Sequence, residues 1–170
     1  MIKIGLLSDT HGELDDRVLH YFKNVDEIWH AGDIGDLCVL DQLKSFKKTR
    51  SVYGNIDNTD IRNETSEYLC FELNGLKILI IHIGGKPPRY TKRSFYLIKK
   101  HKPDIFICGH SHILFVKNDK TNNILCLNPG ASGYKGFHKT RTVLRFVIDS
   151  GIIKDLEVIE LGNRSKLINN

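Results

Sequence analysis

The chain has 170 residues and a formal net charge of +5. This length suits a single domain that buries roughly 70% of the surface its unfolded chain would expose, so no disulfide or metal is needed to hold the fold together. We find no apolar run of membrane-spanning length, and the N-terminal apolar stretch is too short for a signal sequence. The positive segments at 44–50, 86–93 and 99–102 have no aromatic residues interleaved at stacking intervals and are typical of solvated faces. The alternative is that their positive charge attracts phosphate-bearing substrates.

The sequence predicts alternating strands and helices over about the first three quarters of the chain. Short runs rich in Ile, Val and Leu predict strands at 2–8, 27–31, 50–54, 76–83, 104–109 and 123–128. Segments of helical period lie between several of them, at 14–24, 36–48 and 91–102, and the last should end before Pro103. Alternating strands and helices favour parallel pairing, and fully apolar strands indicate sheets covered on both faces.

Two hairpins are expected, one within this pattern and one after it. Asn74-Gly75 lies between two apolar runs over 68–83, and Ser150-Gly151 joins 142–149 to 152–161. Together these features predict two stacked mixed β-sheets flanked by helices, a four-layer αββα sandwich of the α/β (α+β) class. We expect a single domain over 1–162 and a C-terminal tail over 163–170.

The four cysteines are far apart, form no C-x-x-C pair and mostly lie in or beside apolar runs: Cys38, Cys70, Cys108 and Cys126. This pattern is typical of reduced and mostly buried thiols. We therefore expect a cytoplasmic location.

Seven side chains able to bind a metal follow the carboxyl ends of consecutive predicted strands, where the working residues of such sheets gather. In chain order they are Asp9, His11, Asp33, Asn55, His82, His110 and His112. Residues at i and i+2 of an extended chain point to the same side, so Asp9 with His11 can chelate one ion, and His110 with His112 can reach two neighbouring ions. Seven ligands are too many for one ordinary ion and suit two, with a carboxylate bridging them.

Five short motifs in a fixed order carry a resemblance to a known family. "SDTHG", "AGD", "GN", a strand-end His and "GHSH" resemble the calcineurin-like metallophosphoesterase superfamily, and most nearly its YfcE-like phosphodiesterase branch. The resemblance runs from Ile2 to Asp149 and includes "LNPGASG" at 127–133, which is similar to the NPGS loop of that branch.

The resemblance implies two divalent ions per chain. One would take Asp9, His11, Asp33 and His112, and the other Asp33, Asn55, His82 and His110, so that Asp33 bridges. Nitrogen and oxygen ligands suit Mn²⁺, Ni²⁺, Fe²⁺, Zn²⁺ or Co²⁺, and family analogy favours Mn²⁺. A water shared by the two ions would become hydroxide near neutral pH and attack phosphorus in line, with Asp33 and Asn55 as the catalytic residues.

Two positions depart from the wider superfamily. Ile56 stands where many members have a histidine that protonates the leaving oxygen, which favours substrates with good leaving groups. Gly84 stands where many have the second histidine of a His-Gly-His motif, and we expect His112 to fill that role.

Two further histidines have alternative interpretations. His138 follows a glycine-rich loop and is either a substrate contact, binding phosphate or serving as a substitute acid, or a surface loop residue. His30, three residues before Asp33, is either a support that hydrogen-bonds a metal ligand or a packed strand residue.

The function expected from these features is that of a phosphoric diester hydrolase acting on a small phosphodiester. The alternatives are a phosphomonoesterase of the same mechanism and a non-catalytic protein-binding scaffold like the retromer subunit that shares the fold. A nuclease would need an additional nucleic-acid platform, for which 170 residues leave no room. We expect no membrane partner, and the family suggests a homodimer or homotetramer.

Overall fold

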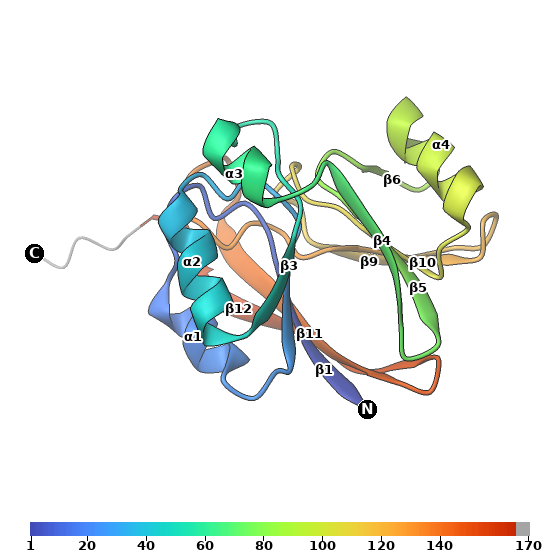
Figure 1. The fold of residues 1–170 in the computed structure, drawn as a ribbon, viewed down its shortest axis with the longest axis horizontal. Coiled ribbons are helices and arrows are strands. Elements are labelled where there is room, and N and C mark those ends of the chain that lie inside the picture. The colour runs from blue at the N-terminus through green and yellow to red at the C-terminus, as the bar shows by residue number, and fades with distance from the viewer. Residues whose placement is uncertain (166–170) are drawn as a thin grey trace, which may run out of the picture.

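The computed structural model of the protein describes residues 1–165, which form two five-stranded mixed sheets (Figure 1). The first sheet has the order β12-β11-β1-β2-β3, with β1 (Ile2–Leu7), β2 (Glu27–His30), β3 (Lys48–Ser51), β11 (Thr140–Asp149) and β12 (Ile152–Asn163). The second has the order β4-β5-β8-β10-β9, with β4 (Tyr68–Leu73), β5 (Leu76–Ile81), β8 (Ile105–Ile107), β9 (Phe115–Asp119) and β10 (Ile124–Asn128). Strands β1, β2 and β3 pair in parallel, as do β5, β8 and β10. The parallel strands therefore form the centre of the second sheet, whereas in the first sheet they extend from the middle strand β1 to the edge strand β3.

Helices cover the outer faces of the two sheets. They are α1 (Asp16–Phe22), α2 (Leu37–Phe46), α3 (Thr59–Glu64) and α4 (Lys92–His101). Val18 and Phe22 of α1 and Leu40 of α2 are buried with Leu7 and Ile28 of the first sheet. Leu97 and Ile98 of α4 pack against the second sheet, on the other side of the molecule (Figure 1). The order of layers is therefore αββα, and the predicted fold class is confirmed.

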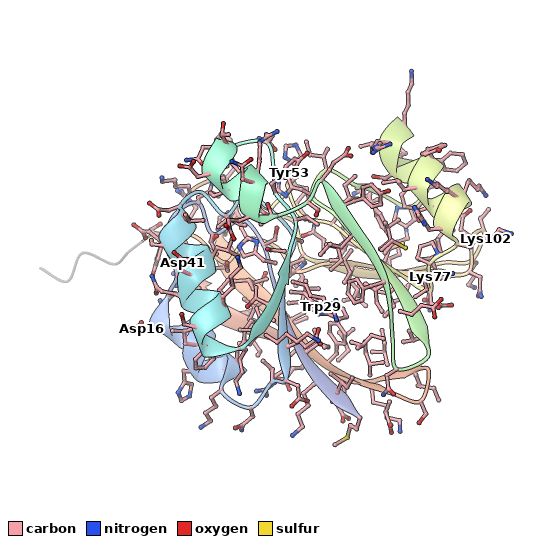
Figure 2. All side chains as sticks on the ribbon, viewed as in Figure 1. Asp16, Trp29, Asp41, Tyr53, Lys77 and Lys102 are labelled. Atoms are coloured by element: carbon pink, nitrogen blue, oxygen red, sulfur yellow. The ribbon has the colours of Figure 1, made fainter. Side chains whose placement is uncertain are left out.

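The central apolar layer lies between the two sheets. Trp29 of β2 is fully buried there, and its ring meets Phe71 of β4 and Phe146 of β11 edge to face, with centroids 5.3 and 5.8 Å apart. Figure 2 shows Trp29 in the interior, whereas the charged residues it labels lie toward the periphery. Because Phe71 belongs to the second sheet and Phe146 to the first, this aromatic cluster joins the sheets.

The helices begin and end where the sequence offers local signals. Asp15, Asp36 and Thr91 are the N-cap residues of α1, α2 and α4, and each side chain accepts a hydrogen bond from a backbone N–H of the first turn. Helix α4 ends at His101, and its C-cap residue Lys102 has a left-handed conformation directly before Pro103, as predicted. Both predicted hairpins are also present.

Several elements differ from the sequence prediction. The third strand covers Lys48–Ser51 instead of 50–54, and α3, β9 and the short pair β6 (Gly85–Lys86) and β7 (Arg89–Tyr90) were not predicted. Helix α3 buries only Ile61, and β9 is an edge strand with mostly exposed side chains, so neither carries a visible apolar period. Strand β12 reaches Asn163, the first residue of the expected tail, and residues 166–170 lie outside the described part of the chain.

Within residues 1–165, no helix is long and apolar enough to cross a membrane.

Candidate metal centre

The seven predicted ligands lie close together, at the carboxyl ends of strands from both sheets. They follow β1, β2 and β3 of the first sheet and β5 and β8 of the second. His11, Asp33, Asn55, His110 and His112 line a single hollow of about 460 Å³, and Asp9 and His82 are buried beside it. The centre therefore depends on the packing of one sheet against the other.

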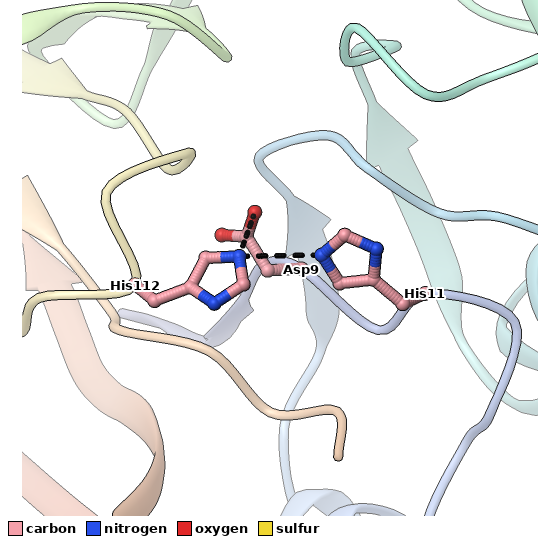
Figure 3. A group of neighbouring side chains, drawn as sticks. All are labelled: Asp9, His11 and His112. Atoms are coloured by element: carbon pink, nitrogen blue, oxygen red, sulfur yellow. Dashed lines mark hydrogen bonds and ion pairs between the residues drawn. The ribbon is translucent and has the colours of Figure 1, made fainter. Parts of the chain in front are cut away.

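The nitrogen and carboxylate donors divide into two groups. In each group the potential ligand atoms lie within 4.8 Å of one another, and the groups are Asp9 with His11 and His112, and Asp33 with His82 and His110. In the first group, drawn in Figure 3, His112 Nε2 is 3.2 Å from His11 Nε2 and 3.2 Å from Asp9 Oδ1. Three converging N and O donors form an arrangement that can hold a divalent cation.

Asp33 connects the two groups through its two carboxylate oxygens. Oδ1 is 3.2 Å from His82 Nε2, in the second group, whereas Oδ2 is 3.8 Å from His11 Nε2, in the first. The backbone N–H of Ile56 donates to Oδ1 over 3.1 Å and helps to fix the orientation of the carboxylate. This geometry is that of a carboxylate able to bridge two ions.

The backbone at the ligands differs from the extended chain assumed for the i, i+2 pairs. Five of the seven are in the left-handed region with φ between 52° and 66°: Asp9, His11, Asp33, His110 and His112. The premise was wrong because the strands end before these residues, and the chain turns back there through hydrogen bonds from Asp9 N to Gly32 O and from His11 N to Asp33 O. Non-glycine residues in this region are strained, and such strain concentrates at functional sites.

Two buried polar atoms at the centre have no hydrogen-bond partner in the described structure: Asp9 Oδ1 and His82 Nε2. A buried polar atom without a partner costs about 1–3 kcal/mol, and a cation bound between such atoms removes that cost. His82 Nδ1 donates to the carbonyl of Ala31 over 2.7 Å, which leaves Nε2 with its lone pair toward the carboxylates. The residues present therefore fit a pair of divalent ions.

The pKa values of His11, Asp33 and His82 at the centre are shifted by burial and by neighbouring side chains. Burial lowers the pKa of His82, but the nearby carboxylates of Asp33 and Asp9 outweigh it, and the net shift is upward. Burial is also the largest influence on His11, whose pKa is lowered. Burial raises the pKa of Asp33, and its contacts with His82 and the Ile56 N–H outweigh this, so the pKa is lowered and the carboxylate is ionised, as a bridging ligand must be.

Asp57 and Asn128 support the centre and were missed by the sequence analysis. Asp57 is buried and accepts the backbone N–H groups of Ile34, Gly35 and Gly54, so it joins the loops after β2 and β3. The buried Asn128 side chain donates to Gly109 O over 2.9 Å and accepts from Gly130 N. Their signal in the sequence is position, since Asp57 is the second residue after "GN" and Asn128 begins "NPG".

His30 and His138 occupy different places around the centre. His30 is fully buried, accepts from Gly32 N at Nδ1 and contacts Thr10 Oγ1 through Nε2 over 2.9 Å. Burial lowers its pKa to about 4, so the ring is neutral and joins the loops after β1 and β2 without contacting a ligand side chain. His138 is part-buried and lies beside His112.

The two departures from the superfamily pattern have clear structural positions. Ile56 lines the hollow and is 46% exposed, so an apolar side chain occupies the place of the usual acid. A Cβ added at Gly84 would lie 2.5 Å from Cys108 Cβ and 2.7 Å from the Phe106 ring. A histidine at position 84 would require both of these buried side chains to move.

Gly54 offers a direct test of how the Asp33 carboxylate is held. A Cβ at this position would lie 2.0 Å from Asp33 Oδ1. Gly54→Ala is therefore expected to displace the carboxylate and weaken divalent-metal binding by at least about tenfold, as measured by calorimetric titration. Circular dichroism serves as the check on folding, and unchanged metal affinity in a folded variant would show that Asp33 is not held as described.

Two mixed sheets in an αββα sandwich, with two linked groups of N and O donors at the strand ends, define a metal-binding protein of the metallophosphoesterase fold. Residues 2–151 match the model of the calcineurin-like phosphoesterase superfamily domain. The chain belongs to this superfamily, which confirms the resemblance found in the sequence.

Individual relatives agree with this assignment. A probable metallophosphoesterase of Methanocaldococcus jannaschii is 37% identical over 134 residues, covering 75% of this chain and 67% of that protein. A probable metallophosphoesterase of Methanothermobacter thermautotrophicus is 31% identical over 133 residues, covering 75% of this chain and 76% of that protein.

Among solved structures, an archaeal phosphodiesterase is similar with a TM-score of 0.75 and 24% identity, covering 94% of this chain and all of the other. Vps29 from Chaetomium thermophilum has a TM-score of 0.76 and 11% identity, covering 97% of this chain and all of the other. At these identities the likeness shows the shared fold.

Proposed function

We propose that the protein is a phosphodiesterase that hydrolyses a small phosphodiester at a dinuclear metal centre. The observation that carries this proposal is the placement of the two Asp33 oxygens toward two separate groups of donors. One ion would be held by Asp9, His11, His112 and Asp33, and the other by Asp33, His82, His110 and Asn55. We propose Mn²⁺ for both, and N and O donors without sulfur are compatible with that ion.

The bound ions would supply an activated water and would offset the negative charge of the phosphoryl group. The protein's own residues orient the reaction. Asn55 is exposed in the hollow and offers its side-chain amide to a non-bridging phosphoryl oxygen. Ile56 supplies no proton to the leaving oxygen, which favours substrates whose leaving group is stable as an anion.

Two hollows that share Asn55 support a diester over a monoester. One is the hollow of about 460 Å³ described above, rimmed by the exposed apolar side chains of Ile56, Ile113 and Phe137. The other, of about 440 Å³, extends past His82 toward Arg62 and Arg93. A diester has two organic groups, and each can enter one hollow with the phosphorus near Asn55.

The arginines of the second hollow are already engaged. Arg93 pairs with Glu67 over 2.6 Å, and Arg62 donates to the carbonyls of Asp57 and Gly54. Because both guanidinium groups are already bonded within the protein, neither is positioned to bind the extra negative charge of a monoester. This arrangement also favours the diester.

The preference for diesters is tested with two chromogenic substrates. The Mn²⁺-loaded protein is expected to cleave bis(p-nitrophenyl) phosphate with a kcat/KM at least about tenfold above that for p-nitrophenyl phosphate, because both organic groups contribute binding. Protein treated with a chelator is the control and should cleave neither. A ratio in favour of the monoester would refute the diester assignment and leave the phosphomonoesterase alternative.

A non-catalytic scaffold is the second candidate, since Vps29 structures share the fold. A scaffold does not require the full set of donors of a catalytic centre, whereas here all seven positions carry a metal-binding side chain and gather in one region. This retention favours the enzyme.

We propose further that the protein acts in the cytoplasm, where its four free cysteines stay reduced. We also propose that its partners are a small phosphoester and copies of itself.

A further inference from the structure

His138 contacts the centre although it is not among the predicted ligands. It lies in the loop between β10 and β11, and its Nδ1 is 3.2 Å from Nδ1 of His112. The two rings meet edge to face with centroids 5.1 Å apart. The contact uses the ring nitrogen of His112 that does not face Asp9 and His11.

The donors and acceptors in the series His112–His138–Gly133 are fixed by its last member, the Gly133 carbonyl. His138 Nε2 lies 3.0 Å from the carbonyl oxygen of Gly133, which can only accept, so Nε2 carries the proton. In a neutral imidazole the other nitrogen is then an acceptor, so His138 Nδ1 accepts a hydrogen bond from His112 Nδ1–H. His112 Nε2 is consequently left with its lone pair, directed toward Asp9 and His11.

The same loop also holds Asp9. The backbone N–H of Gly133 donates to Asp9 O over 3.1 Å, so the loop connects two of the three donors of the first group. Gly136 has φ +125°, and a Cβ there would lie 2.2 Å from His112 Nδ1. Only glycine at this position admits the His112 ring where it lies.

The contacts of His138 also exclude the role of substrate contact or substitute acid, which the sequence left open. Nε2 is engaged by Gly133 and Nδ1 by His112, so the ring has no N–H to give to a leaving oxygen or a phosphate. In the second group of donors, His82 takes its orientation from the Ala31 carbonyl instead of from this loop. Any effect of His138 should therefore be confined to one ion.

We propose that His138 is a positioning residue that holds His112 as an Nε2 donor to one of the two ions. The inference rests on the metal centre of the proposed function but not on its substrate. Partners of this kind, which bond the second nitrogen of a ligand histidine, typically change metal affinity by about 10- to 100-fold when removed.

The test compares three variants by calorimetric titration of the purified, metal-free protein with Zn²⁺. His138→Ala is expected to weaken one of the two Zn²⁺ sites by about 10- to 100-fold and to leave the other unchanged. His138→Gln should keep most of the affinity, because its amide can accept from His112 and donate to Gly133. Lys139→Ala, which alters an exposed neighbour in the same loop, is the matched control and should behave as the unaltered protein.

A spectroscopic measurement separates positioning from general damage to the loop. In the Zn²⁺-loaded protein, the Nδ1–H proton of His112 should exchange slowly with water and give an observable NMR signal. The signal should disappear in His138→Ala and persist in His138→Gln. Equal weakening of both sites, or an unchanged signal and affinity in His138→Ala, would overturn the proposal. Normal Zn²⁺ binding without phosphoester cleavage would instead refute the proposed function and leave the role of His138 standing.

Discussion

Asp33→Asn is expected to lower kcat/KM for a phosphodiester by at least about a thousandfold, which corresponds to roughly 4 kcal/mol of transition-state stabilisation. The two carboxylate oxygens face different groups of donors, so an amide, which is neutral and has one oxygen, cannot serve both. The variant should also bind both ions more weakly. Steady-state kinetics and metal analysis after dialysis measure the two effects.

The matched control for this substitution is Asp36→Asn, three residues further along the chain. Asp36 is the N-cap of α2 and exposed, and asparagine is an equally good cap, so stability and turnover should be preserved. An Asp33→Asn enzyme that retains full activity, or that loses one ion while it binds the other with unchanged affinity, would refute the bridging role.

Substitutions of the two histidines of "GHSH" are expected to weaken different ions. His112 belongs to the group with Asp9 and His11, whereas His110 belongs to the group with Asp33 and His82. Each alanine substitution should weaken one site by more than about 100-fold, since loss of a direct ligand exceeds the usual loss from an outer partner. Titration of each variant with Mn²⁺ or Zn²⁺ resolves the two sites.

His20→Ala is the control for these two variants, because His20 is exposed on α1 and belongs to neither group of donors. It should bind both ions as the unaltered protein does. If His110→Ala and His112→Ala both lost the same ion, the division into two groups would be wrong, and a single site of higher coordination number would replace it.

Much of the fold could be predicted because its signals are local. The strands β1, β5 and β8 are nearly continuous runs of apolar residues, and the hairpin at Asn74-Gly75 has a turn sequence with one dominant geometry. Helix α3 could not be predicted, since Ile61 is its one buried residue and a single apolar position has no period. Strand β9 is defined by its pairing with β10, which a local pattern does not contain.

The candidate ligands could be listed from the sequence because each follows a strand end. Their conformation could not, since the left-handed backbone at Asp9 and His110 depends on hydrogen bonds to segments distant in the chain. Asp57 and Asn128 were missed for the same reason. Their roles consist of bonds to the backbone of the loops that carry the ligands, and the sequence shows only an acid and an amide near glycines.

The sequence by itself determined the fold class, the superfamily and the set of donor residues, because strand ends and short motifs are written in consecutive residues. The resemblance implied how those donors divide between two ions, and only the tertiary structure decided how the Asp33 carboxylate is oriented between the two groups and what His138 contacts. His112 and His138 are 26 positions apart, and His11 and His112 are 101 apart. Such neighbours are created when the two sheets pack together, and that packing depends on the shape of the whole core rather than on any local pattern.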